Sequence, residues 1–335
     1  MKIKAIKLLI PCILSFTCLV GCGDNGGGDK PEEPTKTGYY KDLDFTLEGS
    51  DLEYALQEHA FKKHKNYILY SQFKSYCANS SERYSVERVS KSNSKLQLFY
   101  TGKETSSVRS SDNREHVWPC ANSDNLWTHD KENPNNIHNV DASFYAGGGS
   151  DLYHVRLSNP QVNTARGNSK FVDFDDISED LKADLMEYGE SGGKYKIKIS
   201  GYNLDGTTPS YSDRVEVDDE MKGDVARILL YVWIHYTDRP SVPDGYATVT
   251  YNSGRKTKNI EYSDMVGKLK FTSILGYNKL STCAEKLIEW SENDPPSECE
   301  KLRNDTVQKI QGNRNPFVDF PELVPQVLSE MLYKD

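Results

Sequence analysis

The chain has 335 residues, of which 41 are lysine or arginine and 50 are aspartate or glutamate, so its formal charge is −9. Apolar residues make up 36 % of the sequence, and 23 glycines bring that share close to the globular norm. This composition excludes a disordered chain, a fibrous repeat and a protein with many membrane spans. The length fits one large domain or two smaller ones and is sufficient to bury a sizeable core.

The N-terminus has the features of an export signal. Three lysines among the first seven residues precede an apolar stretch over residues 8–20, which is shorter than the roughly 20 residues that a spanning helix needs. We therefore predict a signal peptide over residues 1–21. The stretch ends Leu-Val-Gly-Cys at residues 19–22, a pattern similar to the lipobox of bacterial lipoproteins, which predicts a diacylglycerol on Cys22. An ordinary secretory signal with an incidental cysteine is the alternative.

A polar segment follows the predicted lipidation site. Residues 22–38 are rich in glycine and charge and lack large apolar side chains, which predicts a flexible tether rather than part of a core. We expect a single folded domain over residues 39–335, monomeric and bound to a membrane only through its lipid. The predicted location is outside the cytoplasm, either periplasmic or extracellular, on a bacterial outer membrane or cell surface.

Four cysteines remain after the leader and the lipidated residue are set aside: Cys77, Cys120, Cys283 and Cys299. An even number in an oxidising compartment favours disulfides. The close spacing of Cys283 and Cys299 makes them the preferred pair, and Cys77 with Cys120 is then the default second pair. Zinc binding is the competing interpretation, but no Cys-x-x-Cys and no neighbouring pair of histidines supports it.

The first half of the folded region alternates between helical, extended and loop patterns. Apolar residues recur at helical spacing within 39–76, whereas 95–101 alternates in part like a strand. The segment 120–150 is rich in asparagine, aspartate and glycine and predicts a long loop. Residues 177–188 have the pattern of an amphipathic helix, and 194–200 alternates like a strand with one solvated face.

The second half is dominated by helical patterns. Residues 221–236 are apolar on almost all sides and predict a buried core helix. Alternation over 246–251 indicates a strand. Two further helices are predicted over 283–290 and 299–311, separated by Pro295-Pro296.

Three segments carry residue types suited to hydrolysis beside a metal ion. They are Asn113–Pro119, which contains Glu115 and His116, then Asp151–Arg156, and then Val162–Asn168, which contains Asn163. Carboxylate and amide oxygens suit a hard ion such as Mg²⁺, and a neutral imidazole can act as a base near neutral pH. These side chains together could activate water beside a cation that neutralises a phosphate.

The same segments resemble the endonuclease I family of secreted nucleases. The Glu-His-x-x-Pro step at 115–119, the Asp-Leu-x-x-Val step at 151–155 and the Val-Asn-x-x-Arg-x-Asn step at 162–168 match that family in order and spacing. Segments at 222–231 and 287–317 are similar to its central helix and C-terminal signature. The resemblance extends from about residue 39 to residue 323, with gaps.

This resemblance implies an α+β domain built around a ββα-metal (His-Me) finger. It implies His116 as the general base, and Glu115 and Asn163 as ligands of Mg²⁺ or another hard divalent cation such as Mn²⁺ or Ca²⁺. The implied activity is sequence-nonspecific hydrolysis of DNA, with RNA as a further substrate, leaving 5′-phosphate ends. Two alternatives remain open, a catalytically silent nucleic-acid-binding lipoprotein and a surface adhesion module.

The phosphate-contacting residue is less clearly indicated. Members of the family often carry an arginine in the loop after the Glu-His step, but residues 120–150 contain no arginine. Lys131, Arg114, Arg156 and Arg166 are the candidates for that role. A lysine would supply charge without the bidentate geometry of a guanidinium.

Overall fold

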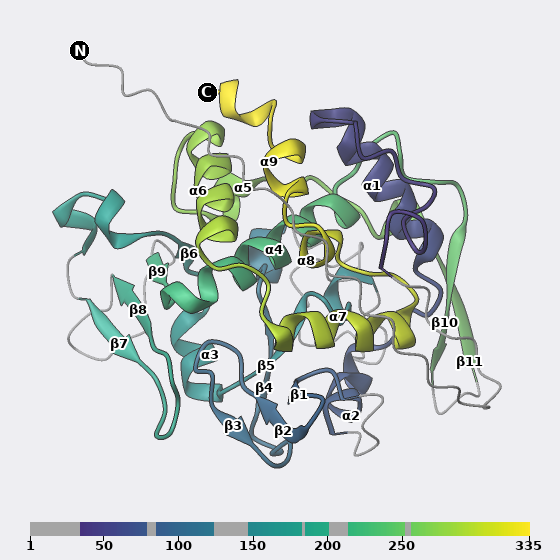
Figure 1. Cartoon of the computed structure of the whole chain (residues 1–335). Coiled ribbons are helices and arrows are strands. Elements are labelled where there is room, and N and C mark those ends of the chain that lie inside the picture. The colour runs from purple at the N-terminus through teal and green to yellow at the C-terminus, as the bar shows by residue number, and fades with distance from the viewer. Residues whose placement is uncertain (1–33, 79–84, 124–146, 183–184, 201–213, 252–255) are drawn as a thin grey trace, which may run out of the picture. The chain divides into compact units, whose positions relative to one another are not determined.

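The computed structural model describes residues 34–335 except 79–84, 124–146, 183–184, 201–213 and 252–255 (Figure 1). The described residues belong to one compact unit, residues 31–335. The expected signal peptide over 1–21, Cys22 and most of the expected tether over 22–38 lie outside the described residues. In the described part of the chain, no helix combines the length and apolar character needed to cross a membrane.

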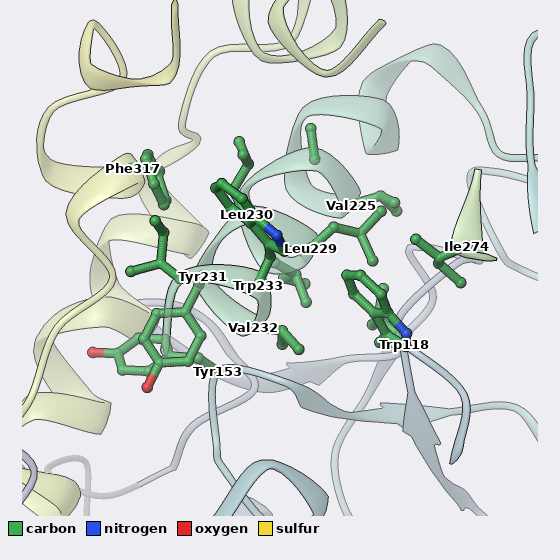
Figure 2. Packing of buried hydrophobic residues seen from close by; sticks show 14 of the residues in the cluster. Trp118, Tyr153, Val225, Leu229, Leu230, Tyr231, Val232, Trp233, Ile274 and Phe317 are labelled. Atoms are coloured by element: carbon green, nitrogen blue, oxygen red, sulfur yellow. The ribbon is translucent and has the colours of Figure 1, made fainter. Parts of the chain in front are cut away.

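A long helix, α4 (Asp219–Tyr236), runs through the buried core. The side chain of Asp218 accepts a hydrogen bond from the backbone N–H of Glu220 and so caps its first turn. Figure 2 shows side chains from several sides of this helix packing among apolar residues from other elements. The prediction of a buried helix over 221–236 is confirmed, because a helix that is apolar on almost all sides has to be covered on almost all sides.

Two long helices and α4 form the main helical packing. The helices α1 (Gly49–Lys63) and α6 (Leu280–Asn293) both pack against α4. After the break at Pro295-Pro296, Ser297 caps α7 (Glu298–Gln311) by accepting from the backbone N–H of Glu300. The two predicted C-terminal helices are thus confirmed. The shorter helices are α2 (Phe73–Ala78), α3 (Pro160–Arg166), α5 (Phe271–Ile274), α8 (Pro316–Asp319) and α9 (Leu323–Val327).

The described strands form four small sheets. One sheet has the order β1-β2-β3, another β6-β9-β8-β7, and two are the pairs β10-β11 and β4-β5. Their bounds are Arg88–Ser90 (β1), Asn93–Gln97 (β2), Glu104–Thr105 (β3), Asn113–His116 (β4), Val155–Ser158 (β5), Lys170–Phe171 (β6), Met186–Tyr188 (β7), Ile197–Ser200 (β8), Arg214–Glu216 (β9), Tyr246–Tyr251 (β10) and Lys256–Glu261 (β11). Helices and sheets mix within one unit, which confirms the α+β class.

The predicted amphipathic helix over 177–188 is wrong. A short 3₁₀ turn occupies Glu179–Lys182, and the chain then enters β7, which pairs antiparallel with β8. Strand pairing satisfies the backbone of Met186–Tyr188, and the periodicity of so short a segment does not separate a strand from a helix. The strands predicted near 95–101 and 194–200 are present but shorter, since β2 ends at Gln97 and β8 begins at Ile197.

The expected disulfides are also wrong. Cys77, Cys283 and Cys299 carry free thiols, so neither the 283–299 pair nor the 77–120 pair forms. The thiol of Cys299 donates to the carbonyl of Arg88, whereas that of Cys283 donates to the carbonyl of Tyr277. Closeness in sequence therefore did not bring the two helix-borne thiols together. Among the described residues, no cysteine belongs to a cluster that could hold a metal ion.

Gly223 on α4 allows a close approach between that helix and the end of α6. A Cβ atom placed at Gly223 would lie 1.9 Å from the carbonyl oxygen of Asp294, and backbone cannot move away cheaply. We therefore expect Gly223→Ala to lower the free energy of unfolding by about 1–3 kcal/mol, as measured by urea denaturation. An unchanged unfolding midpoint would contradict this packing, and Lys309→Ala, at an exposed position of α7, serves as the control.

Candidate active site

The Glu-His step lies on a strand that is followed in the fold by a strand and a helix. The strand β4 pairs antiparallel with β5, with Glu115 opposite Arg156 and His116 opposite Val155. The helix α3 (Pro160–Arg166) begins two residues after β5 and packs against β4. The side chain of Asn159 caps α3 by accepting from two backbone N–H groups of its first turn. This strand–strand–helix unit carries Glu115, His116 and Asn163.

Glu115 is buried in a polar setting. Its side chain accepts a hydrogen bond of 2.7 Å from the hydroxyl of Tyr100, and the guanidinium of Arg166 lies 3.5 Å from the same oxygen. Burial raises the pKa of Glu115, and the positive charge of Arg166 and the Tyr100 hydrogen bond oppose that shift. Tyr100 adopts a backbone φ of +68°, which is rare for a residue with a side chain. The hydrogen bond from Tyr100 and the ion pair with Arg166 together hold the Glu115 carboxylate in one orientation.

His116 faces the opposite side of β4 from Glu115, as neighbours on a strand do. Its Nε2 atom lies 2.7 Å from the carbonyl oxygen of Gly149, and its ring stacks on that of Tyr70. Since a carbonyl only accepts, Nε2 carries the hydrogen and Nδ1 carries the lone pair. Burial lowers the pKa of His116 to about 4, and the charges of nearby arginines add to the effect. The ring is therefore neutral at physiological pH and can accept a proton through Nδ1.

Asn163 contributes an unsatisfied acceptor on α3. Its side-chain oxygen Oδ1 is buried and has no hydrogen-bond partner, an arrangement that is uncommon in folded proteins. Residues three apart on a helix lie on the same face, and Arg166, three residues further on, reaches the carboxylate of Glu115. The unpartnered amide oxygen therefore belongs to the face of α3 that is directed toward Glu115.

Two of the four candidate phosphate contacts do not fit that role. Arg156 is 7 % exposed and forms a two-point ion pair with Glu87, with distances of 3.1–3.3 Å. Arg166 is fully buried, where it donates to the carbonyl of Val117 and pairs with Glu115. Both side chains are occupied inside the protein, which leaves no free guanidinium face for a substrate phosphate.

Arg114 is the described candidate that remains. It is partly exposed, donates to the carbonyl of Tyr70 and lies with its guanidinium 3.9 Å from the centre of that ring. The Tyr70 ring thus contacts both Arg114 and His116. Lys131 lies outside the described residues.

Sequence reasoning missed the short glycine turn that holds the histidine. The 3₁₀ turn η4 (Gly147–Gly149) presents two carbonyl groups: that of Gly149 to His116, and that of Gly148 to Nδ1 of the buried His154. The other ring nitrogen of His154 accepts from the backbone N–H of Trp118. The three consecutive glycines were the available signal, but the identity of their partner depends on tertiary structure.

His154 gives a prediction for the pH dependence of stability. Burial lowers its pKa to about 3 in the folded protein, whereas a histidine in an unfolded chain titrates near about 6.5. Between pH 6.5 and pH 3 the unfolded chain binds a proton at His154 that the folded protein does not bind. The free energy of unfolding therefore has its full His154 contribution above about pH 6.5 and loses it as the pH falls. We expect the decline to approach about 1.4 kcal/mol per pH unit for this one group.

Urea denaturation at several pH values between 7.5 and 4.5 measures this effect. His154→Gln should have a flatter pH dependence of unfolding free energy than the wild type. Equal slopes of unfolding free energy against pH in the two proteins would show that His154 does not cause the loss of stability at low pH.

Comparisons with known proteins agree with the class of site described above. The family model described as Endonuclease I matches residues 46–322. The chain therefore belongs to the endonuclease I family. It is 31 % identical over 216 residues to a protein named extracellular ribonuclease from Bacillus subtilis (strain 168). The aligned residues make up 64 % of this chain and 53 % of that relative. A protein of the same name from Bacillus amyloliquefaciens is 32 % identical over 216 residues, with the same coverage. The chain thus spans about half the length of these curated relatives.

Proposed function

We propose that this protein is a metal-dependent endonuclease that hydrolyses nucleic acid phosphodiesters with little sequence preference. The observation that carries the proposal is the buried, unpartnered amide oxygen of Asn163 on the helix face beside Glu115. An oxygen acceptor of this kind is explained by a cation that it and the carboxylate share. Membership of the endonuclease I family supports the same reaction class.

The residues present fit a hard divalent cation. Glu115 and Asn163 offer one carboxylate and one amide oxygen, which is the donor chemistry of Mg²⁺ sites that retain several waters. Mn²⁺ and Ca²⁺ also accept such ligands. A cation would in addition favour the charged form of Glu115, whose burial raises its pKa. When bound, the ion would neutralise charge that develops on the phosphoryl oxygens during attack.

His116 supplies the base in this proposal. The Gly149 carbonyl fixes the ring orientation and the position of its hydrogen, so Nδ1 is directed to take a proton from the attacking water. The stacked Tyr70 ring restricts rotation of the imidazole. Arg114, whose guanidinium lies against the Tyr70 ring, is the described candidate best placed to contact a substrate phosphate. Arg166 acts as a positioning residue, because its charge is used inside the protein to hold Glu115.

The substrate is proposed to be DNA, RNA or both, cut to leave 5′-phosphate ends. The relatives named extracellular ribonuclease add weight to RNA. Incubation with supercoiled plasmid and with structured RNA, each with Mg²⁺ or with EDTA, tests the proposal. We expect cleavage that requires the metal, with products that a 5′-phosphate-dependent exonuclease degrades. A silent binding protein would retard nucleic acid without cutting it, and an adhesion module would do neither.

We further propose that the enzyme works outside the cytoplasm, in agreement with the name extracellular ribonuclease that its relatives carry. A signal peptide over 1–21, a lipid on Cys22 and a tether over 22–38 would hold the domain near a membrane. Detergent phase partition of the protein from its native host tests this. Cys22→Ser should move the protein from the detergent phase to the aqueous phase, and an unchanged distribution would contradict lipidation.

A further inference from the structure

Three buried side chains meet at a place separate from Glu115, His116 and Asn163. His64 follows the last residue of α1, Asp151 follows the turn η4, and His235 lies in the last turn of α4. One ligand atom from each of the three lies within 4.8 Å of the other two. Segments that are more than 80 residues apart in the sequence therefore converge here.

The imidazoles in this cluster carry unsatisfied atoms. His64 is 3 % exposed and His235 is fully buried. Nδ1 and Nε2 of His64 and Nε2 of His235 have no partner in full hydrogen-bond geometry, and the backbone of Asn66 lies near the His64 ring. Nδ1 of His235 lies 2.9 Å from the hydroxyl of Tyr231, which itself donates to Asp151. Nδ1 therefore carries the hydrogen, and Nε2 of His235 is left with a free lone pair. Orphaned polar atoms in a native interior require an explanation such as a bound ion.

The buried carboxylate of Asp151 also favours a bound cation. This side chain is 2 % exposed, and in the described part of the chain its partner within ion-pair distance is His235 at 3.9 Å. The carboxylate accepts hydrogen bonds from the hydroxyls of Tyr231 and Tyr236 on one oxygen, and from the backbone N–H of Tyr153 and the side-chain amide of Gln311 on the other. All four donors are neutral, so they orient the carboxylate but supply no positive charge. A buried, uncompensated charge is unfavourable.

We propose that His64, Asp151 and His235 form a second metal site, which takes Zn²⁺ or a similar divalent transition ion. Two neutral imidazoles and one carboxylate are a donor set typical of zinc, unlike the all-oxygen set at Glu115 and Asn163. Ligands about 2.0–2.1 Å from zinc lie about 3.4 Å apart in a tetrahedron. The ligand atoms of the three side chains, which lie within 4.8 Å of one another, would therefore approach each other by at most about 1.4 Å. The ion would take the place of one tyrosine hydroxyl at Asp151.

The role of this second ion is structural. It would join the end of α1, the end of α4 and Asp151, which lies two residues after η4. The backbone N–H of Asp151 donates to the carbonyl of Gly147 in that turn, and the carbonyl of Gly149 orients His116. The ion would therefore brace the turn that positions the proposed base.

A variant lacking the Mg²⁺ ligands separates the two sites. Glu115→Gln with Asn163→Ala removes the donors of the first site and leaves the second intact. This protein is unfolded with EDTA, refolded free of metal and titrated with Co²⁺ and with Zn²⁺. We expect one ion per chain, visible absorption bands of tetrahedrally coordinated Co²⁺, and a rise of several degrees in unfolding midpoint with Zn²⁺. The absence of stoichiometric binding at micromolar Co²⁺ and Zn²⁺ would overturn the proposal.

A further substitution in the same protein tests the ligands. His64→Gln should abolish the Co²⁺ bands and the Zn²⁺-dependent shift, whereas His59→Gln, at another buried histidine of α1, should retain both. Retention of the bands by a folded His64→Gln protein would also overturn the proposal. If that variant does not fold, the titration of the protein with His64 intact decides the matter.

Discussion

His116→Ala is expected to reduce the rate of nucleic acid hydrolysis by about 10²–10⁴-fold, the usual contribution of a positioned general base. The reason is that the neutral Nδ1 of His116, set by the Gly149 carbonyl, has no replacement among the described residues of β4. Initial rates on plasmid and on RNA at saturating Mg²⁺ measure the effect. The fold should persist, because the ring is partly exposed and its hydrogen bond is to a backbone carbonyl.

A matched substitution controls for the loss of a histidine as such. His59→Gln changes a ring that stacks on Tyr40, in α1, and should leave the rate within a factor of a few of the wild type. If His116→Ala retains more than a tenth of the wild-type rate while its circular dichroism is unchanged, His116 is not the base.

Glu115→Gln is expected to have an effect of similar size through a different route. The substitution keeps the shape of the side chain and its contact with Tyr100 but removes the charge that would attract a cation. It also leaves the buried guanidinium of Arg166 without its carboxylate at 3.5 Å. We expect the Kd for Mn²⁺, measured by calorimetry, to rise by at least about 10–100-fold, the loss that changes around metal ligands produce, and the rate at fixed Mg²⁺ to fall by orders of magnitude.

Asn163→Ala gives the companion result. It should raise the Mg²⁺ concentration needed for half-maximal rate, with a smaller loss of the maximal rate than Glu115→Gln. Glu104→Gln, a carboxylate of β3 paired with Lys95, is the control and should change neither quantity. Unchanged metal dependence in Asn163→Ala would remove this residue from the ligand set.

The elements that could be predicted from sequence are those whose signals are local. The helix over 221–236 is apolar on almost all sides, and α7 begins at a serine cap after two prolines, so both are encoded within a few residues. The segment 177–188 could not be predicted in this way. Its C-terminal part becomes β7 because β8, which begins at Ile197, supplies the pairing. Local periodicity contains no information about that partner.

The candidate site shows the same difference between features encoded locally and features that depend on distant residues. Glu115, His116 and Asn163 could be proposed from the sequence because their motifs resemble those of the endonuclease I family in order and spacing. The roles of the arginines were not, because a sequence shows charge but not burial: Arg156 is neutralised by Glu87, 69 positions earlier. The carbonyl that orients His116 comes from Gly149, 33 positions later. The thiol of Cys299, which donates to Arg88 rather than bonding to Cys283, shows the same dependence on distant partners.

A crystal structure of the protein with Mn²⁺, with anomalous differences recorded at the manganese edge, tests the central claim most directly. The account predicts an anomalous peak between the carboxylate of Glu115 and Oδ1 of Asn163, about 2.0–2.3 Å from each, on the side from which Nδ1 of His116 can reach the attacking water. The account would be contradicted if crystals that cleave nucleic acid in the presence of Mn²⁺ had no anomalous peak shared by Glu115 and Asn163.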